Sequence, residues 1–135
     1  MEMFRNDDFS RLEINLKGCL ENYRYFRSKL EPSTKLLVLV KANAYGHGAV
    51  EFATLMEEAG ADYLDVNAGT GPERELEDML WLLSLVKETA PETPICIDSP
   101  SARTCVRALP FCRRPGLINS VSMEGDKIDT IFPVV

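Results

Sequence analysis

The most constraining feature of this sequence is a repeated alternation of short apolar segments with amphipathic helical segments. The segment Lys35 to Lys41 (KLLVLVK) is apolar between its two lysines. Such a run is typical of a strand that is buried on both faces of a parallel sheet. Strand, helix, strand and helix in succession imply right-handed crossovers and one parallel sheet. We predict further strands at 62–67, 94–98 and 116–120, and helices at 49–59, 73–89, 101–109 and 123–132.

The N-terminal region precedes this alternation. Leu12 to Leu16 alternates apolar and polar residues and is predicted to be a short strand. Leu20 to Leu30 is predicted to be a helix, which Pro32 stops. We therefore expect residues 1–34 to form an N-terminal extension with a helix, ahead of the first βα unit at 35–62.

Chain length narrows the choice of fold. A complete (β/α)8 barrel needs about 250 residues, and this chain has 135. The predicted fold class is α/β, a partial TIM (β/α)8 barrel of about four βα units with parallel strands, in a single domain over 1–135. A doubly wound open sheet is the alternative. Cutting a barrel after four strands leaves two open edges, so we also expect a homodimer.

Composition excludes several classes of function. The net charge of −6 leaves no surplus of Lys and Arg to neutralise phosphates, which argues against nucleic-acid binding. The apolar runs are shorter than the ~20 residues that span a bilayer, and Met1 to Ser10 does not resemble a signal peptide, so we expect a cytoplasmic chain without membrane contact. The four cysteines show no C-x-x-C spacing, which predicts reduced structural thiols and no metal site.

Polar side chains follow each predicted strand. In both candidate folds the functional site lies beyond the carboxyl ends of the strands, so these residues are candidates for one shared site. Each taken singly is also explained as a cap of the following helix, and the lysine as a surface side chain with a buried stem. The candidates are Lys41 and Asn43, Asp65 and Asn67, Asp98 and Ser99, and Asn119 and Ser120.

Residues 11–64 resemble alanine racemase, a pyridoxal-phosphate enzyme with a (β/α)8 barrel. The resemblance depends on VKANAYGHG at Val40 to Gly48, with LEINL and YFRSKL upstream. It implies that Lys41 is the catalytic lysine that binds the pyridoxal aldehyde, and that Tyr45 contacts this cofactor near its phosphate. His47 is interpreted as a turn residue near the site and not as a base.

Residues 60–135 resemble a different family, the methyltetrahydrofolate:corrinoid methyltransferases and the pterin-binding domain of cobalamin-dependent methionine synthase. The segments that carry this resemblance are GADYLDVNAG, PICIDSP and GLINSVSMEGDKI. It implies a barrel in which Asp98 and Asn119 bind the pterin of methyltetrahydrofolate, with Asp65 and Asn67 on the same rim and Asn67 nearer to the ligand. A corrinoid protein is the partner that the family implies.

The chain therefore resembles a chimera of two barrel families, joined within EEAGADYL at 57–64. Each family has further strands and domains that have no counterpart in these residues, so we expect little catalytic turnover. Three functions stay open at this point. The first is a pterin-binding fragment of the methyltransferase type, the second is a pyridoxal-phosphate-binding fragment of the racemase type, and the third is a non-catalytic scaffold.

Overall fold

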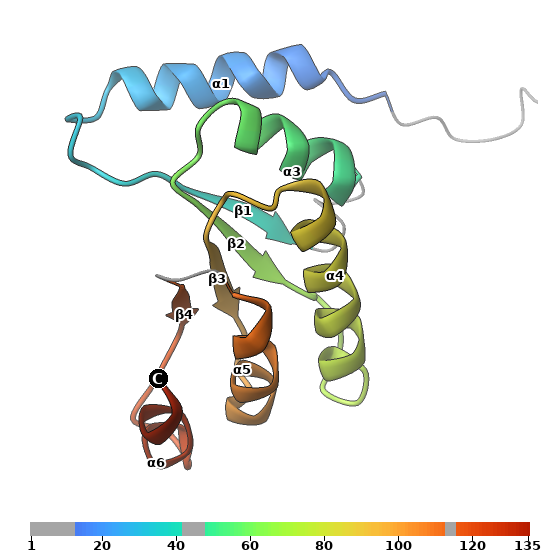
Figure 1. Ribbon diagram of the computed structural model, residues 1–135, viewed down its shortest axis with the longest axis vertical. Helices are drawn as coiled ribbons and strands as arrows, with labels where there is room; N and C mark the ends of the chain where they lie inside the picture. Colours follow the sequence, from blue (N-terminus) through green and yellow to red (C-terminus); the bar gives the residue numbers. More distant parts are fainter. Residues whose placement is uncertain (1–12, 42–47, 113–115) are drawn as a thin grey trace, which may run out of the picture.

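A single parallel sheet organises the protein. The computed structural model describes residues 13–41, 48–112 and 116–135. The strands β1 (Leu37–Lys41), β2 (Tyr63–Asn67), β3 (Ile95–Asp98) and β4 (Leu117–Asn119) pair in parallel in the order β1-β2-β3-β4 (Figure 1). Strand order equals chain order, as in successive units of a (β/α)8 barrel. The α/β class with four parallel strands is confirmed, and the arrangement is that of half a TIM barrel.

Helices follow the strands along one side of the sheet. Helix α3 (Ala49–Glu58) follows β1, α4 (Glu75–Thr89) follows β2, and α5 (Ala102–Ala108) follows β3. Helix α6 (Lys127–Ile131) lies beyond β4, and α1 (Leu16–Ser28) precedes β1 and lies beside α3 (Figure 1). Two short 3₁₀ segments, η2 (Leu109–Phe111) and η3 (Phe132–Val134), end α5 and the described chain.

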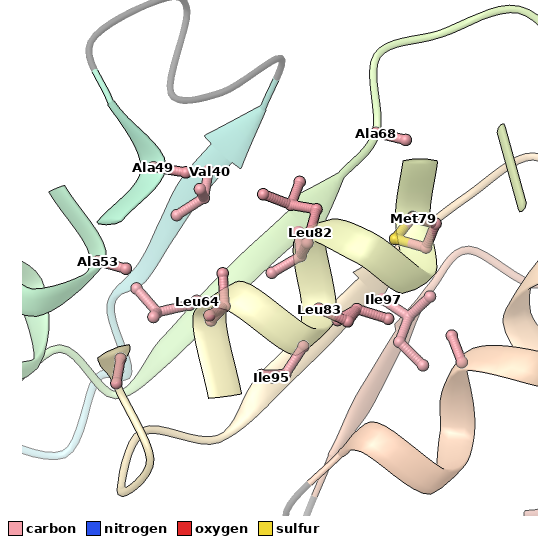
Figure 2. Close-up of a cluster of buried hydrophobic side chains, with 14 of the residues drawn as sticks. Val40, Ala49, Ala53, Leu64, Ala68, Met79, Leu82, Leu83, Ile95 and Ile97 are labelled. Atoms are coloured by element: carbon pink, nitrogen blue, oxygen red, sulfur yellow. The ribbon is translucent and has the colours of Figure 1, made fainter. Parts of the chain in front are cut away.

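The core lies between the sheet and helices α3 to α5. On one face of the sheet, Val40, Leu64, Val66 and Ile97 have no exposed surface. Figure 2 shows Val40, Leu64 and Ile97 pointing toward the helix layer. Alternation along each strand requires the neighbouring residues to point the opposite way. Helix packing on one face thus leaves the other face to carry the polar residues, as on the inside of a barrel. The helix side of this core is formed by Ala49, Ala53, Met79, Leu82 and Leu83.

The N-terminal strand prediction was wrong. Residues 13–15 have no regular structure, and helix α1 begins at Leu16. Asn15 is the reason, because its side-chain oxygen accepts a hydrogen bond from the Gly18 N–H at 3.0 Å. Such an N-cap satisfies one of the free donors in the first turn of a helix. The apolar–polar alternation of Leu12 to Leu16 therefore reflects a helix entry, and the helix starts four residues earlier than predicted.

The corner between α3 and β2, where the two resemblances meet, is bonded to both sides. The Glu57 carboxylate accepts hydrogen bonds from the N–H groups of Glu92 and Thr93, at 2.9 and 2.8 Å, and from the Thr93 hydroxyl at 2.9 Å. The Asp62 carboxylate accepts from Lys35 Nζ and from the Leu36 N–H, both at 2.8 Å. The corner thereby ties the start of β1 to β2 and α3 to the start of β3.

Candidate functional site

Three of the predicted site residues lie side by side at the carboxyl edge of the sheet. Asn67 ends β2, Asp98 ends β3 and Asn119 ends β4. Asn67 Nδ2 donates a hydrogen bond to Asp98 Oδ2 at 2.9 Å, and Asp98 pairs in register with Asn119. Lys41, at the end of β1, pairs in register with Asn67. Pairing in register puts the side chains of neighbouring strands on the same face, so Lys41, Asn67, Asp98 and Asn119 form one row, here called the rim row.

The strand positions one step below the rim row form a second row on the same face. Leu39 pairs with Asp65, Asp65 with Cys96, and Cys96 with Leu117. Asp65 is 4% exposed and Cys96 is buried, whereas both leucines have substantial exposure. A buried carboxyl and thiol therefore lie beneath a rim of carboxylate and amide groups.

The surroundings of Asp65 shift the pKa of its carboxyl. Burial raises the pKa of its carboxyl, and the neighbouring Asp98 carboxylate raises it further, while the Cys96 thiol and the Asn119 amide act in the opposite direction. Its Oδ1 atom has no hydrogen-bond partner among the described residues. Burial disfavours the ionised form of this carboxyl, so a charge on Asp65 is destabilising here. Burial also raises the pKa of the Cys96 thiol, so Cys96 stays protonated at neutral pH.

Ser99 follows Asp98 directly, but it does not join the rim. Its side chain is buried on the helix side, where Ser99 Oγ donates a hydrogen bond to Glu75 Oε1 at 2.5 Å. Thr104 Oγ1 donates to Glu75 Oε2 at 3.1 Å. Glu75 therefore joins the end of β3 to α5 from the first turn of α4. In the sequence, Glu75 is an acid in the first turn of a helix, where the helix dipole favours it, and its two partners lie too far along the chain for any local pattern to reveal them.

Of the remaining predicted candidates, Ser120 and Lys41 lie within the described residues and the others do not. Ser120 follows β4 and is exposed, and its carbonyl accepts a hydrogen bond from Lys127 Nζ at 3.1 Å. Asn43, Tyr45 and His47 lie outside the described residues, so the proposed cofactor contact of Tyr45 stays a prediction. Lys41 is half-buried at the strand end, as the sequence predicts.

Metal ligands and membrane spans were also sought. Among the residues of the three described ranges, no group of three or more His, Cys, Asp or Glu side chains is placed to hold a metal ion. None of the helices in the described part of the chain combines the length and the apolar character that crossing a bilayer requires.

Comparison with known proteins yields two different families. The model of the alanine racemase N-terminal domain matches residues 14–68. This segment includes α1, β1, α3 and β2, and therefore both Lys41 and Asn67. The match ends just after the carboxyl end of β2.

Individual relatives show the same division. A methylcorrinoid:tetrahydrofolate methyltransferase of Eubacterium limosum is 51% identical over 82 residues, which are 61% of this chain and 30% of the relative. An alanine racemase of Lactobacillus delbrueckii subsp. bulgaricus is 57% identical over 51 residues, 38% of this chain and 14% of the relative. An alanine racemase of Synechocystis is 46% identical over 55 residues, 41% of this chain and 15% of the relative. The chain thus spans less than a third of the length of each of these proteins.

Proposed function

We propose that the rim row binds the pterin ring of a tetrahydrofolate. The observation that carries the proposal is the contact between Asn67 and Asp98 beside Asn119, at the carboxyl ends of three adjacent parallel strands. This is the edge at which barrels and open α/β sheets bind their ligands. The likeness to a methyltransferase whose name includes tetrahydrofolate supports the choice of ligand.

The chemistry of the row suits a pterin edge. A pterin presents ring N–H and exocyclic amino donors next to a carbonyl acceptor. The Asp98 carboxylate accepts two such donors, and the Asn67 and Asn119 amides each offer one acceptor and two donor hydrogens. Asn67 also orients Asp98, and its own oxygen accepts a hydrogen bond from the Gly69 N–H at 2.7 Å. The acceptor is therefore held in place before a ligand arrives.

The proposal concerns binding. Methyl transfer to or from a corrinoid belongs to the relative, of which the chain covers 30%, and we propose that this chain by itself turns over little or no substrate. Orientation of both reactants and stabilisation of the transition state require groups from the whole constellation of a site. A corrinoid protein as partner remains a proposal of the same kind.

Calorimetric titration with methyltetrahydrofolate tests the pterin site. Asp98→Ala and Asn119→Ala should each weaken binding by about 1–3 kcal/mol, because each removes one partner of a hydrogen-bonded pair. Asp129→Ala on α6 removes an exposed carboxylate elsewhere and should leave the affinity unchanged. Equal affinity in all three variants, or no binding by the parent chain, would rule out the pterin site.

A second candidate function is covalent binding of pyridoxal phosphate by Lys41. The racemase match and the place of Lys41 on the rim favour it. The residues fit this cofactor in one respect, since an amine at the end of an apolar strand faces a rim with hydrogen-bonding groups. Pyridoxal phosphate, when bound to a lysine, supplies an electron sink for chemistry at the α-carbon of amino acids.

Borohydride reduction after incubation with pyridoxal phosphate tests this second function. We expect mass spectrometry to place the reduced adduct on Lys41 and Lys41→Ala to remove it. Lys35 is the matched control, because it is exposed and its hydrogen bond to Asp62 raises the pKa of the amine, which disfavours the neutral form that reacts with an aldehyde. Equal labelling of Lys35 and Lys41 would contradict a special role for Lys41.

A further inference from the structure

The sheet has two open edges within the described part of the chain. β1 pairs with β2 on one side, and β4 pairs with β3 on the other. The outer sides of β1 and β4 therefore present backbone N–H and C=O groups without a neighbouring strand in the sheet. Open edges of this kind favour pairing with a further strand.

Apolar side chains next to both edges are also left uncovered. On the face opposite the helix layer, Leu37 is 39% exposed, Leu39 is 36% exposed and Leu117 is 41% exposed. The first two belong to β1 and the third to β4. Burying such side chains is favourable at about 25 cal/mol per Å² of apolar surface. The exposure is concentrated at the two edge strands, while Cys96 in the central strand β3 is buried on this same face.

Each edge strand also borders an apolar groove. One groove, of about 410 Å³, lies between α1, β1 and α3 and is lined by Phe26, Leu37 and Phe52 among others. The other, of about 560 Å³, lies between β4, η2 and η3 and is lined by Leu117 and Val134 among others. Each of the two ends of the structure, the β1 end and the β4 end, therefore carries an apolar groove.

The two ends carry opposite charge. Residues 16–41, which form α1 and β1, include six basic and two acidic side chains, a net charge of +4. Residues 117–135, which form β4, α6 and η3, include three acidic and one basic side chain, a net charge of −2. A contact between the two ends is favoured by this difference, and a contact between two identical ends is opposed by it.

We propose that a second copy of this chain occupies both edges. A two-fold axis parallel to the strands places β1 of each copy beside β4 of the other, so both new contacts keep the parallel direction. The same operation brings the basic end of each copy to the acidic end of its partner. Eight parallel strands then close into one barrel, which has no edges and encloses Leu39 and Leu117. This proposal is independent of the pterin and pyridoxal-phosphate proposals.

Sedimentation velocity on the parent chain and on edge variants tests the proposal. The parent should sediment as a dimer at micromolar concentration, and the dimer should weaken in high salt. Leu39→Lys on β1 and Leu117→Lys on β4 should each give a monomer. Trp81→Lys replaces a side chain of α4 that is 61% exposed and should remain dimeric. Circular dichroism checks that every variant is folded, and the partial exposure of both leucines makes the substitutions tolerable.

A mixing experiment then identifies which edges meet. Each proposed contact joins one β1 to one β4, so both contacts are impaired when either variant associates with itself. An equimolar mixture of Leu39→Lys and Leu117→Lys keeps one unaltered contact and should form a heterodimer. A monomeric parent chain would overturn the proposal. Dimerisation of either variant on its own would also overturn the proposal. It would mean that β1 pairs with β1, or β4 with β4, and not β1 with β4.

Discussion

Asn67 and Asp98 are joined across two adjacent strands by a hydrogen bond of 2.9 Å between Nδ2 and Oδ2. The bond uses one amide donor and one carboxylate oxygen, and no hydrogen bond within the described residues occupies the other oxygen of Asp98. The Asn67 oxygen is bonded in turn to the Gly69 N–H. The rim is therefore a set of oriented groups whose geometry is fixed by β2, by β3 and by the loop after β2.

Replacing Glu75 should destabilise the fold. Glu75→Ala removes the acceptor of two buried hydroxyls, those of Ser99 and Thr104, and leaves both without their charged partner. We expect the free energy of unfolding to fall by about 2–3 kcal/mol in urea titrations. Glu77→Ala, at an exposed position of the same helix, is the control and should change it by less than about 0.5 kcal/mol. A similar loss in both variants would contradict the buried bridge.

Asp65→Asn should stabilise the protein at neutral pH, because it removes a buried charge while keeping the shape of the side chain. Burial raises the pKa of Asp65, so the parent chain is less stable above that pKa than below it. The gain, on the order of 1 kcal/mol, should therefore shrink as the pH falls through the raised pKa. Thermal unfolding at several pH values measures the difference, with Asp129→Asn as an exposed control. A gain that is independent of pH would contradict the account.

Asp62 should contribute stability with the opposite pH dependence. Its hydrogen bonds to Lys35 and to the Leu36 N–H lower the pKa of the carboxyl. The contribution is therefore complete above the unfolded pKa of about 4 and is lost as the pH falls through the lower pKa of the folded state. Asp62→Asn should cost about 1 kcal/mol at neutral pH and progressively less in acid. Unfolding curves with a constant difference across that range would argue against this bond pattern.

Tyr23→Phe should loosen the attachment of α1. The Tyr23 hydroxyl donates a hydrogen bond to the Gly60 carbonyl at 3.0 Å and so ties α1 to the corner before β2. Loss of this bond should cost about 1 kcal/mol of unfolding free energy. Tyr25→Phe is the matched control, since Tyr25 is exposed on the same helix. Hydrogen exchange of the α1 amides should accelerate in the first variant alone.

Much of the fold was predictable because each strand and helix has its own local signature. The apolar run at Lys35 to Lys41 and the helical rhythm of residues 73–89 match β1 and α4 within a few residues. The start of α1 was not predictable from alternation, because the Asn15 cap decides it and an apolar–polar pattern over five residues fits two structures. Helix boundaries depend on such single hydrogen bonds.

The sequence predicted that the site residues lie at the ends of the strands. It did not predict which of these side chains point to the rim and which point to the helix layer. Asp98 and Ser99 are consecutive, and the pleat directs them to opposite sides, one to the rim and the other to Glu75. From the sequence alone, both are polar residues at the end of the same strand, so it does not indicate which of them belongs to the site. The raised pKa of Asp65 comes from its burial in the sheet and from the Asp98 carboxylate on the neighbouring strand, so it required the three-dimensional arrangement.

The order of the strands has a consequence for synthesis. Because each strand pairs with the strand made just before it, the sheet can grow from β1 toward β4 as the chain leaves the ribosome. Every step closes only one short crossover, which keeps the entropy cost of each step small. The rim row is then assembled in the same sequence. Lys41 and Asn67 meet first, and the acceptor Asp98 and the amide of Asn119 arrive only with the last two strands.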